Sequence, residues 1–226
     1  MTPAALAAFC SIHRATPASL ACDRCGTFSC AACFTFIGER TFCLACLLRS
    51  LDQLRPITSL SVATVILMRV SSVSIALNAV TESMGVAVWA RGLLAVPGCF
   101  AQLATLAVFS LWFHRAVKWS LVLGEVAGIS PEWALASWFV PVVNLITPFN
   151  VMRAMSPGAN VTAWQVTWLG GGLVTFFAVL SVNTQAFLAG ALATGVSGLI
   201  AAHCVASATR TLESAALAKR EKSLAS

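Results

Sequence analysis

Long apolar stretches dominate the chain from residue 57 onward, and short polar or charged segments separate them. A membrane-crossing helix needs about 20 mostly apolar residues. Four stretches approach that length, at about 57–81, 92–113, 164–181 and 186–207. The pattern therefore predicts an all-α helical membrane bundle with four transmembrane helices, within an integral membrane domain of residues 56–209.

The segment 131–152 is also apolar but is built differently. Pro141, Asn144 and Pro148 interrupt it at short intervals. Proline removes a backbone hydrogen-bond donor, and bare backbone is costly in lipid unless protein covers it. We expect a re-entrant or interfacial element packed on the bundle; a proline-kinked fifth span is the alternative.

The first 55 residues carry a series of metal-ligand pairs instead of an apolar stretch. Residues 1–8 are expected to be disordered, and residues 9–50 to form a zinc module. The ligands are, in chain order, Cys10, His13, Cys22, Cys25, Cys30, Cys33, Cys43 and Cys46. A two-residue gap lets both members of a pair reach one metal, and eight ligands serve two tetrahedral zinc ions. We expect two structural zinc ions, because so short a segment buries too little apolar surface to fold alone.

A disulfide scaffold is the competing reading of these cysteines. Seven of the nine cysteines lie in the first 46 residues, an odd number, and a histidine completes the fourth pair. Both features favour metal ligands over disulfides. The other two, Cys99 and Cys204, stand singly in apolar runs and are expected to be small buried hydrophobes.

The motif Cys10-x2-His13, followed by Cys-x2-Cys-x4-Cys-x2-Cys over residues 22–33, resembles a B-box zinc finger across about residues 9–47. The resemblance implies that the ligand pairs interleave in a cross-brace. One zinc would take Cys10, His13, Cys30 and Cys33, and the other Cys22, Cys25, Cys43 and Cys46. The family usually ends in His-x2-His where this chain has Cys-x2-Cys. A sequential pairing, first with second and third with fourth, is the alternative.

Few residues can fill the interior of the module, and few can contact nucleic acid. The core candidates are Leu20, Phe28, Phe34, Phe36, Ile37 and Phe42. The arginines of the module are scattered, which argues against a nucleic-acid finger. A FYVE-like lipid finger shares the central cysteine spacing, but its basic motif is absent. A protein-docking module is the better interpretation.

Composition and charge placement support a membrane protein with a defined orientation. The chain is 58% hydrophobic and 10% charged, with a net charge of +6, whereas soluble domains are about a quarter charged. Basic residues gather in the segments assigned to the cytoplasm, including a basic tail at 210–226, and the outside loop 82–91 has one. The positive-inside rule then places both termini in the cytoplasm. Tryptophans near the inner ends of the spans predict an interfacial belt: Trp112, Trp119, Trp133, Trp138, Trp164 and Trp168.

Arg69 is the only charge in the middle of the first predicted span. An arginine there costs about 2.5–3.5 kcal/mol, so we expect it to face the bundle or a wet cavity. The alternative is that the first helix is long and tilted and that Arg69 snorkels to the interface.

The run from Trp112 to Met155 contains Ser-Pro-x-Trp at 130–133, then Trp-Phe-x-Pro-x-x-Asn-Leu at 138–145 and a further proline, Pro148. It resembles the bacterial membrane family called domain of unknown function 4328, loosely over residues 57–210. The resemblance implies a bacterial inner-membrane protein and supports the fold without supplying an activity. It singles out Trp138, Phe139, Pro141, Asn144 and Pro148. Asn144 and Pro141 either lock a re-entrant turn or expose groups that bind an ion or small polar ligand.

Residues 195–203 superficially resemble a rhomboid protease, with Gly-x-Ser-Gly followed by an alanine and a histidine. Ser197 and His203 are six residues apart on one predicted helix, which separates them by about 9 Å and about 240°. They cannot form a catalytic dyad, and we expect no enzyme. The small residues instead allow close helix packing, possible also between two copies of the chain.

These features together favour an adaptor or regulator whose cytoplasmic zinc module docks a protein partner at the lipid bilayer. The alternative is a small transporter or channel component that uses Arg69 and the segment containing Pro141, Asn144 and Pro148.

Overall fold

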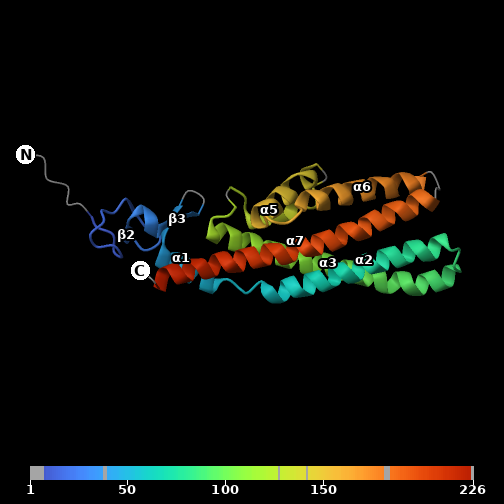
Figure 1. Cartoon of the computed structure of the whole chain (residues 1–226), viewed down its shortest axis with the longest axis horizontal. Coiled ribbons are helices and arrows are strands. Elements are labelled where there is room, and N and C mark those ends of the chain that lie inside the picture. Colours follow the sequence, from blue (N-terminus) through green and yellow to red (C-terminus); the bar gives the residue numbers. More distant parts are fainter. Residues whose placement is uncertain (1–7, 38–39, 127, 141, 181–183, 225–226) are drawn as a thin grey trace, which may run out of the picture.

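The computed structural model of the chain describes residues 8–37, 40–126, 128–140, 142–180 and 184–224. A small N-terminal module of strands lies at one end of an elongated bundle of helices (Figure 1). The segment expected to be disordered, 1–8, lies outside the described residues except for Ala8.

The N-terminal module consists of two short antiparallel hairpins, a turn of 3-10 helix and one α-helix. Strand β1 (Leu20–Ala21) pairs with β2 (Phe28–Ser29), and β3 (Phe34–Ile37) pairs with β4 (Arg40–Cys43). The 3-10 helix η1 (Ala31–Cys33) precedes β3, and α1 (Leu44–Gln53) follows β4 directly.

The interior of this module contains cysteine side chains in place of the predicted apolar core. Phe34 and Phe42 pack against the buried cysteines, but Leu20, Phe28 and Phe36 are exposed. The core prediction is wrong for these three. Two-stranded hairpins this short have one face toward the sulfur atoms and leave the other in solvent.

Four helices build the bundle: α2 (Thr58–Ser83), α3 (Val88–Leu123), α6 (Val161–Leu180) and α7 (Thr184–Leu224). Helices α2 and α3 form one antiparallel pair and α6 and α7 another, and α7 also packs along α2. The ends of α2 and α6 that are far from the N-terminal module lie at the same end of the bundle (Figure 1). The C-terminal part of α7 therefore returns to the module, where it contacts α1.

Three of the described helices are long and apolar enough to cross a membrane, at Thr58–Ser83, Ala95–Leu123 and Gln185–Glu221. The prediction of four spans is therefore not supported. The predicted span 164–181 forms α6, of 20 residues, and its last predicted residue lies outside the described part of the chain. Helix α6 runs beside α7 for most of its length.

Helices α3 and α7 continue well past the predicted ends of their spans, 113 and 207. Arg115 and Lys118 end the apolar run in the sequence, but α3 continues because its other face buries Phe113 and Val117. It ends at Gly124, whose φ of 81° is left-handed and caps the helix. Helix α7 reaches Leu224, so the described part of the predicted tail, 210–224, is an extension of this helix that buries Leu212.

The segment 131–152 does not form a fifth span. It contains α4 (Pro131–Ala136), the 3-10 turn η2 (Val143–Leu145) and α5 (Thr147–Met155), each far too short to cross a bilayer. Helix α4 packs on α3 and α5 packs on α6 and α7. The segment therefore connects α3 to α6 and packs on both, in the part of the bundle nearer to the module (Figure 1).

An aromatic cluster fills the core beneath this segment. Phe149 is fully buried, and its ring centroid lies 5.7 Å from Trp138, 5.2 Å from Trp164 and 6.0 Å from Trp168. Trp112 and Trp164 are also buried. The predicted interfacial belt is wrong for these two tryptophans, because both side chains are buried in the core of the bundle.

The glycines of α7 serve contacts within the chain. A Cβ on Gly190 would lie 2.7 Å from the backbone nitrogen of Thr175 in α6, and one on Gly198 would collide with Ser72 Oγ in α2. The predicted close packing is present. The surface suggested for a second copy of the chain is covered by α2 and α6 at these positions.

Candidate metal centres and membrane cavity

Each ligand pair sits on a tight turn that aims two side chains in one direction. The backbone N–H of Cys33 donates to the carbonyl of Cys30 (2.9 Å), and Gly26, with a φ of 71°, turns the chain directly after Cys25. Cys43 is the N-cap residue of α1, so Cys46 follows it in the first helical turn. Local backbone geometry thus places the two members of these pairs close together.

The structure brings the eight predicted ligands together in two groups. One contains Cys10, His13, Cys30 and Cys33, and the other Cys22, Cys25, Cys43 and Cys46. Within each group all ligand atoms lie within 4.8 Å of one another. The grouping is interleaved, as the B-box resemblance implies, and not sequential. All nine cysteines are free of disulfides.

The distances between ligand atoms fit tetrahedral zinc. Bond lengths of about 2.3 Å to sulfur and about 2.0 Å to nitrogen place two sulfurs about 3.8 Å apart, and a sulfur and a nitrogen about 3.6 Å apart. The Sγ atoms of Cys25 and Cys43 are 3.7 Å apart, as are those of Cys30 and Cys33. His13 Nδ1 lies 3.3–4.0 Å from the three sulfurs of its group. Each group would hold one ion with protein ligands at all four positions, which leaves no position for a substrate.

The thiols of each group differ in acidity. Hydrogen bonds, chiefly from the His13 backbone, lower the pKa of Cys10 to about 6, whereas burial raises the pKa of Cys33 to about 12. In the second group, Thr27 lowers the pKa of Cys25 to about 6 and burial raises that of Cys46 to about 12. Several thiolates this close together repel one another, so a cation is needed to hold the full set ionised.

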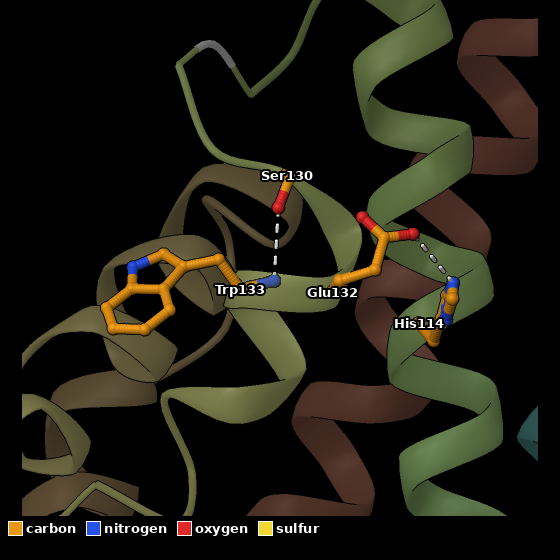
Figure 2. A network of polar contacts seen from close by, with 4 residues as sticks. All are labelled: His114, Ser130, Glu132 and Trp133. Carbon is orange, nitrogen blue, oxygen red and sulfur yellow. Dashed lines mark hydrogen bonds and ion pairs between the residues drawn. The ribbon is translucent and has the colours of Figure 1, made fainter.

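The Ser-Pro-x-Trp sequence starts helix α4 and ties it to α3 (Figure 2). Ser130 Oγ accepts a hydrogen bond from the Trp133 backbone N–H (3.1 Å), and Pro131 occupies the first turn. Glu132 lies 3.8 Å from His114 Nε2 on α3. Figure 2 shows the Trp133 side chain pointing away from this contact. The motif therefore holds the first turn of α4 against α3.

A cavity of about 350 Å³ lies among α2, α3, α6 and α7, and the segment after α4 lines it as well. Of the predicted membrane positions, Trp138, Phe139 and Asn144 line this cavity. Pro148 is buried at the start of α5, and Pro141 lies outside the described residues. The walls from α2 and α3 include Ser71, Ser72 and Thr105. Their small polar side chains at helical spacing were a signal that sequence reasoning missed.

Arg69 is not part of this cavity. Its neighbour Met68 lines the cavity, but Arg69 lies on the exposed face of α2. The expectation that Arg69 faces the bundle is therefore wrong, and the structure does not bring it together with Asn144. The exposed position fits the snorkelling alternative.

Ser197 and His203 lie on one helix, α7, as predicted, and do not meet. Ser197 is buried, and its Oγ is 3.5 Å from the Trp164 carbonyl, whereas His203 is exposed.

Comparison with known proteins identifies the family of most of the helical bundle. No curated protein and no solved structure matches the chain. The sequence model described as domain of unknown function (DUF4328) matches residues 76–216, from the second half of α2 to the end region of α7. This range includes all the cavity-lining residues of α3, α6 and α7 and the segment between them. The chain therefore belongs to the domain of unknown function 4328 family.

Proposed function

We propose that this protein is a membrane-anchored adaptor: its zinc module docks a protein partner, and the bundle holds that partner at the bilayer. The observation that carries the proposal is that the module is fastened to the bundle on one side and presents apolar side chains on the other.

The fastening is made by α1 and the ends of α3 and α7. Leu51 of α1 is buried in the same core as Leu212 of α7. Asp52 pairs with Arg220 at 2.5 Å, and Lys219 Nζ donates to the Leu123 carbonyl at 2.7 Å. The module is thus held to the bundle by apolar burial and polar contacts together, and a bound partner would be held at a defined distance from the membrane.

The part of the module around β2, which lies away from the bundle in Figure 1, carries exposed aromatic side chains. Phe9 is 55% exposed and Phe28 is 52% exposed. Aromatic residues are enriched at protein interfaces, where their burial contributes strongly to affinity. Two closed zinc sites would stabilise this surface without taking part in chemistry.

The proposed orientation places the module in the cytoplasm of a bacterial cell, at the inner membrane. The turn between α2 and α3, at the end of the bundle far from the module, contains Glu82 and no basic side chain before Arg91. Many basic residues belong instead to segments nearer to the module (Figure 1): Arg49, Arg55, Arg115, Lys118, Arg153, Arg210, Lys219 and Arg220. The positive-inside rule supports that orientation.

The test is quantitative co-purification from native membranes at matched protein levels. We expect a partner to copurify with the wild type and to be lost from Phe9→Ser/Phe28→Ser, because this variant removes these two exposed aromatic side chains and keeps every metal ligand. Cys25→Ser should lose the partner as well, whereas Cys99→Ser should retain it, since Cys99 is an exposed thiol outside both groups.

Zinc content measured on each preparation separates loss of the surface from loss of the fold. The same partner profile in all four proteins would contradict the adaptor function.

A further inference from the structure

The cavity among the four long helices contains two polar groups that the chain does not satisfy. Trp138 Nε1 and Asn144 Oδ1 are buried and have no hydrogen-bond partner among the described residues. Both residues line the cavity. A buried polar group without a partner costs about 1–3 kcal/mol, and such groups are rare in folded proteins. One is a donor and the other an acceptor.

Several of the other small polar side chains around the cavity are paired within the chain. Ser72 Oγ donates to the Met68 carbonyl (2.7 Å), and Thr194 Oγ1 to the Gly190 carbonyl (2.9 Å). Ser71 and Thr105 are hydrogen-bonded to each other across α2 and α3 (2.8 Å). Among the described residues that line the cavity, the buried polar atoms without a partner lie on the segment that carries Trp138 and Asn144.

The rest of the cavity lining favours a ligand without charge. In the described part of the chain, the cavity is lined by apolar, aromatic, hydroxyl and amide side chains and by no Asp, Glu, Lys, Arg or His. A charged group would be desolvated there without a counter-ion, which is strongly unfavourable. Pockets of a few hundred Å³ with apolar walls and a few placed polar groups are typical of small-molecule sites between helices.

The position of the cavity indicates where the ligand comes from. Its walls belong to the parts of α2, α3 and α7 that are apolar enough to cross a membrane. Two of its lining residues, Leu106 and Phe139, are half or more exposed on the outer surface of the protein. The cavity thus adjoins the surface that these helices would present to the hydrocarbon region of a bilayer.

We infer that the cavity binds an uncharged lipid of the bilayer that carries a free hydroxyl group, such as a long-chain alcohol or a diacylglycerol. The hydrocarbon chain lies against the apolar and aromatic walls. The hydroxyl accepts a hydrogen bond from Trp138 Nε1 and donates one to Asn144 Oδ1, since a hydroxyl is the smallest group able to do both.

The first experiment uses the intact zinc-loaded protein in nanodiscs of zwitterionic lipid. The probe is hexadecanol with a diazirine in its chain, and the comparison is its methyl ether, which keeps the oxygen as an acceptor but cannot donate. Mass spectrometry locates the label after irradiation. We expect the alcohol to label cavity peptides, such as those containing Leu106 and Phe139, at least about fivefold more than the ether does, because one hydrogen bond is lost.

Variants test the two polar groups without emptying the cavity. Trp138→Phe keeps an aromatic ring and removes the donor, and Asn144→Leu keeps the volume and removes the acceptor. Each should reduce labelling by the alcohol about fivefold. Asn144→Leu should leave labelling by the ether nearly unchanged, because the ether cannot donate to Asn144. Trp138→Phe should reduce labelling by the ether as well, because the ether oxygen still accepts from Trp138 Nε1. Phe100→Ala, on the exposed face of α3 away from the cavity, should label like the wild type.

Equal labelling by alcohol and ether in the wild type would overturn the inference, and this measurement needs no variant to fold. Labelling spread evenly over the exposed face of α3 around Phe100 would also overturn it, because that pattern is ordinary contact with bulk lipid.

Discussion

The N-terminal module and the half of the bundle nearer to it have interiors of opposite kinds. Among the described residues from 8 to 43, every buried apolar side chain is a cysteine. In the bundle the buried side chains are large, and the aromatic rings of Trp112, Phe113 and Phe149 are fully enclosed. The first region would therefore depend on bound metal ions, and the second depends on packing, although α1 joins them into one structure.

The largest effect should come from removing the metal. A structural zinc ion contributes about 10–16 kcal/mol in isolated fingers, more than a small module gains from packing. Chelation should unfold residues 9–43 and leave the bundle folded. Hydrogen–deuterium exchange would show this as full loss of protection in the module and unchanged protection in residues 105–120. A module that stays protected after complete metal removal would mean that its own packing is sufficient.

Pairs of cysteine substitutions test how the metal sites are built. Because Cys10 and Cys33 share one group, Cys10→Ser/Cys33→Ser should keep one zinc per chain. Cys10→Ser/Cys22→Ser damages both groups and should keep none. Elemental analysis of the purified proteins gives the stoichiometry, with Cys99→Ser as the control at two ions per chain. A sequential arrangement would reverse the results of the two double variants.

The bundle should respond to loss of aromatic packing and not to loss of metal. Phe149→Ala should destabilise the bundle by about 3–5 kcal/mol, as expected for a fully buried aromatic ring. Phe100→Ala removes the same atoms from a side chain that is 70% exposed, so its effect on unfolding should stay within about 0.5 kcal/mol. Thermal unfolding in detergent measures both. Similar midpoints for the two variants would show that the cluster around Phe149 is not the stabilising core.

The smallest effect concerns the polar contact between the two regions. Asp52 and Arg220 are both more than half exposed, and such pairs contribute about 0–1 kcal/mol and weaken as salt rises. A double-mutant cycle with Asp52→Asn and Arg220→Gln should give a coupling energy in that range. Leu51→Ala, at the buried contact next to this pair, should cost about 2–5 kcal/mol. A coupling energy above that of the leucine truncation would make the ion pair the main joint.

The elements best predicted from sequence were those with a local signal. Thr58–Ser83 agrees with the predicted span 57–81 to within two residues, because an apolar run ends at polar Glu82. The interruption at 131–152 was also readable, since prolines act on their own backbone. The grouping of Cys10 with Cys30 came from a family resemblance, because spacing alone allows either pairing.

The elements that were missed depend on contacts between distant parts of the chain. Arg115 and Lys118 suggested the end of a helix, yet α3 continues because α7 covers its other face. Phe28 was expected inside the module, although sulfur atoms occupy that interior. The cavity joins residues as distant as Met68 and Ala201, and no short motif encodes it.

Helix α7 has a mechanical consequence that follows from its continuity. Over its 41 residues it extends about 60 Å without a break. Gly198 at the cavity wall and Arg220 at the contact with α1 are separated by about 33 Å of the same rod. A tilt of about 5° around Gly198 would displace Arg220 by about 3 Å, because a stiff helix converts a small rotation into a larger translation at its end. Any rotation of α7 about the cavity wall would therefore appear as a larger displacement where its far end meets α1 of the N-terminal module.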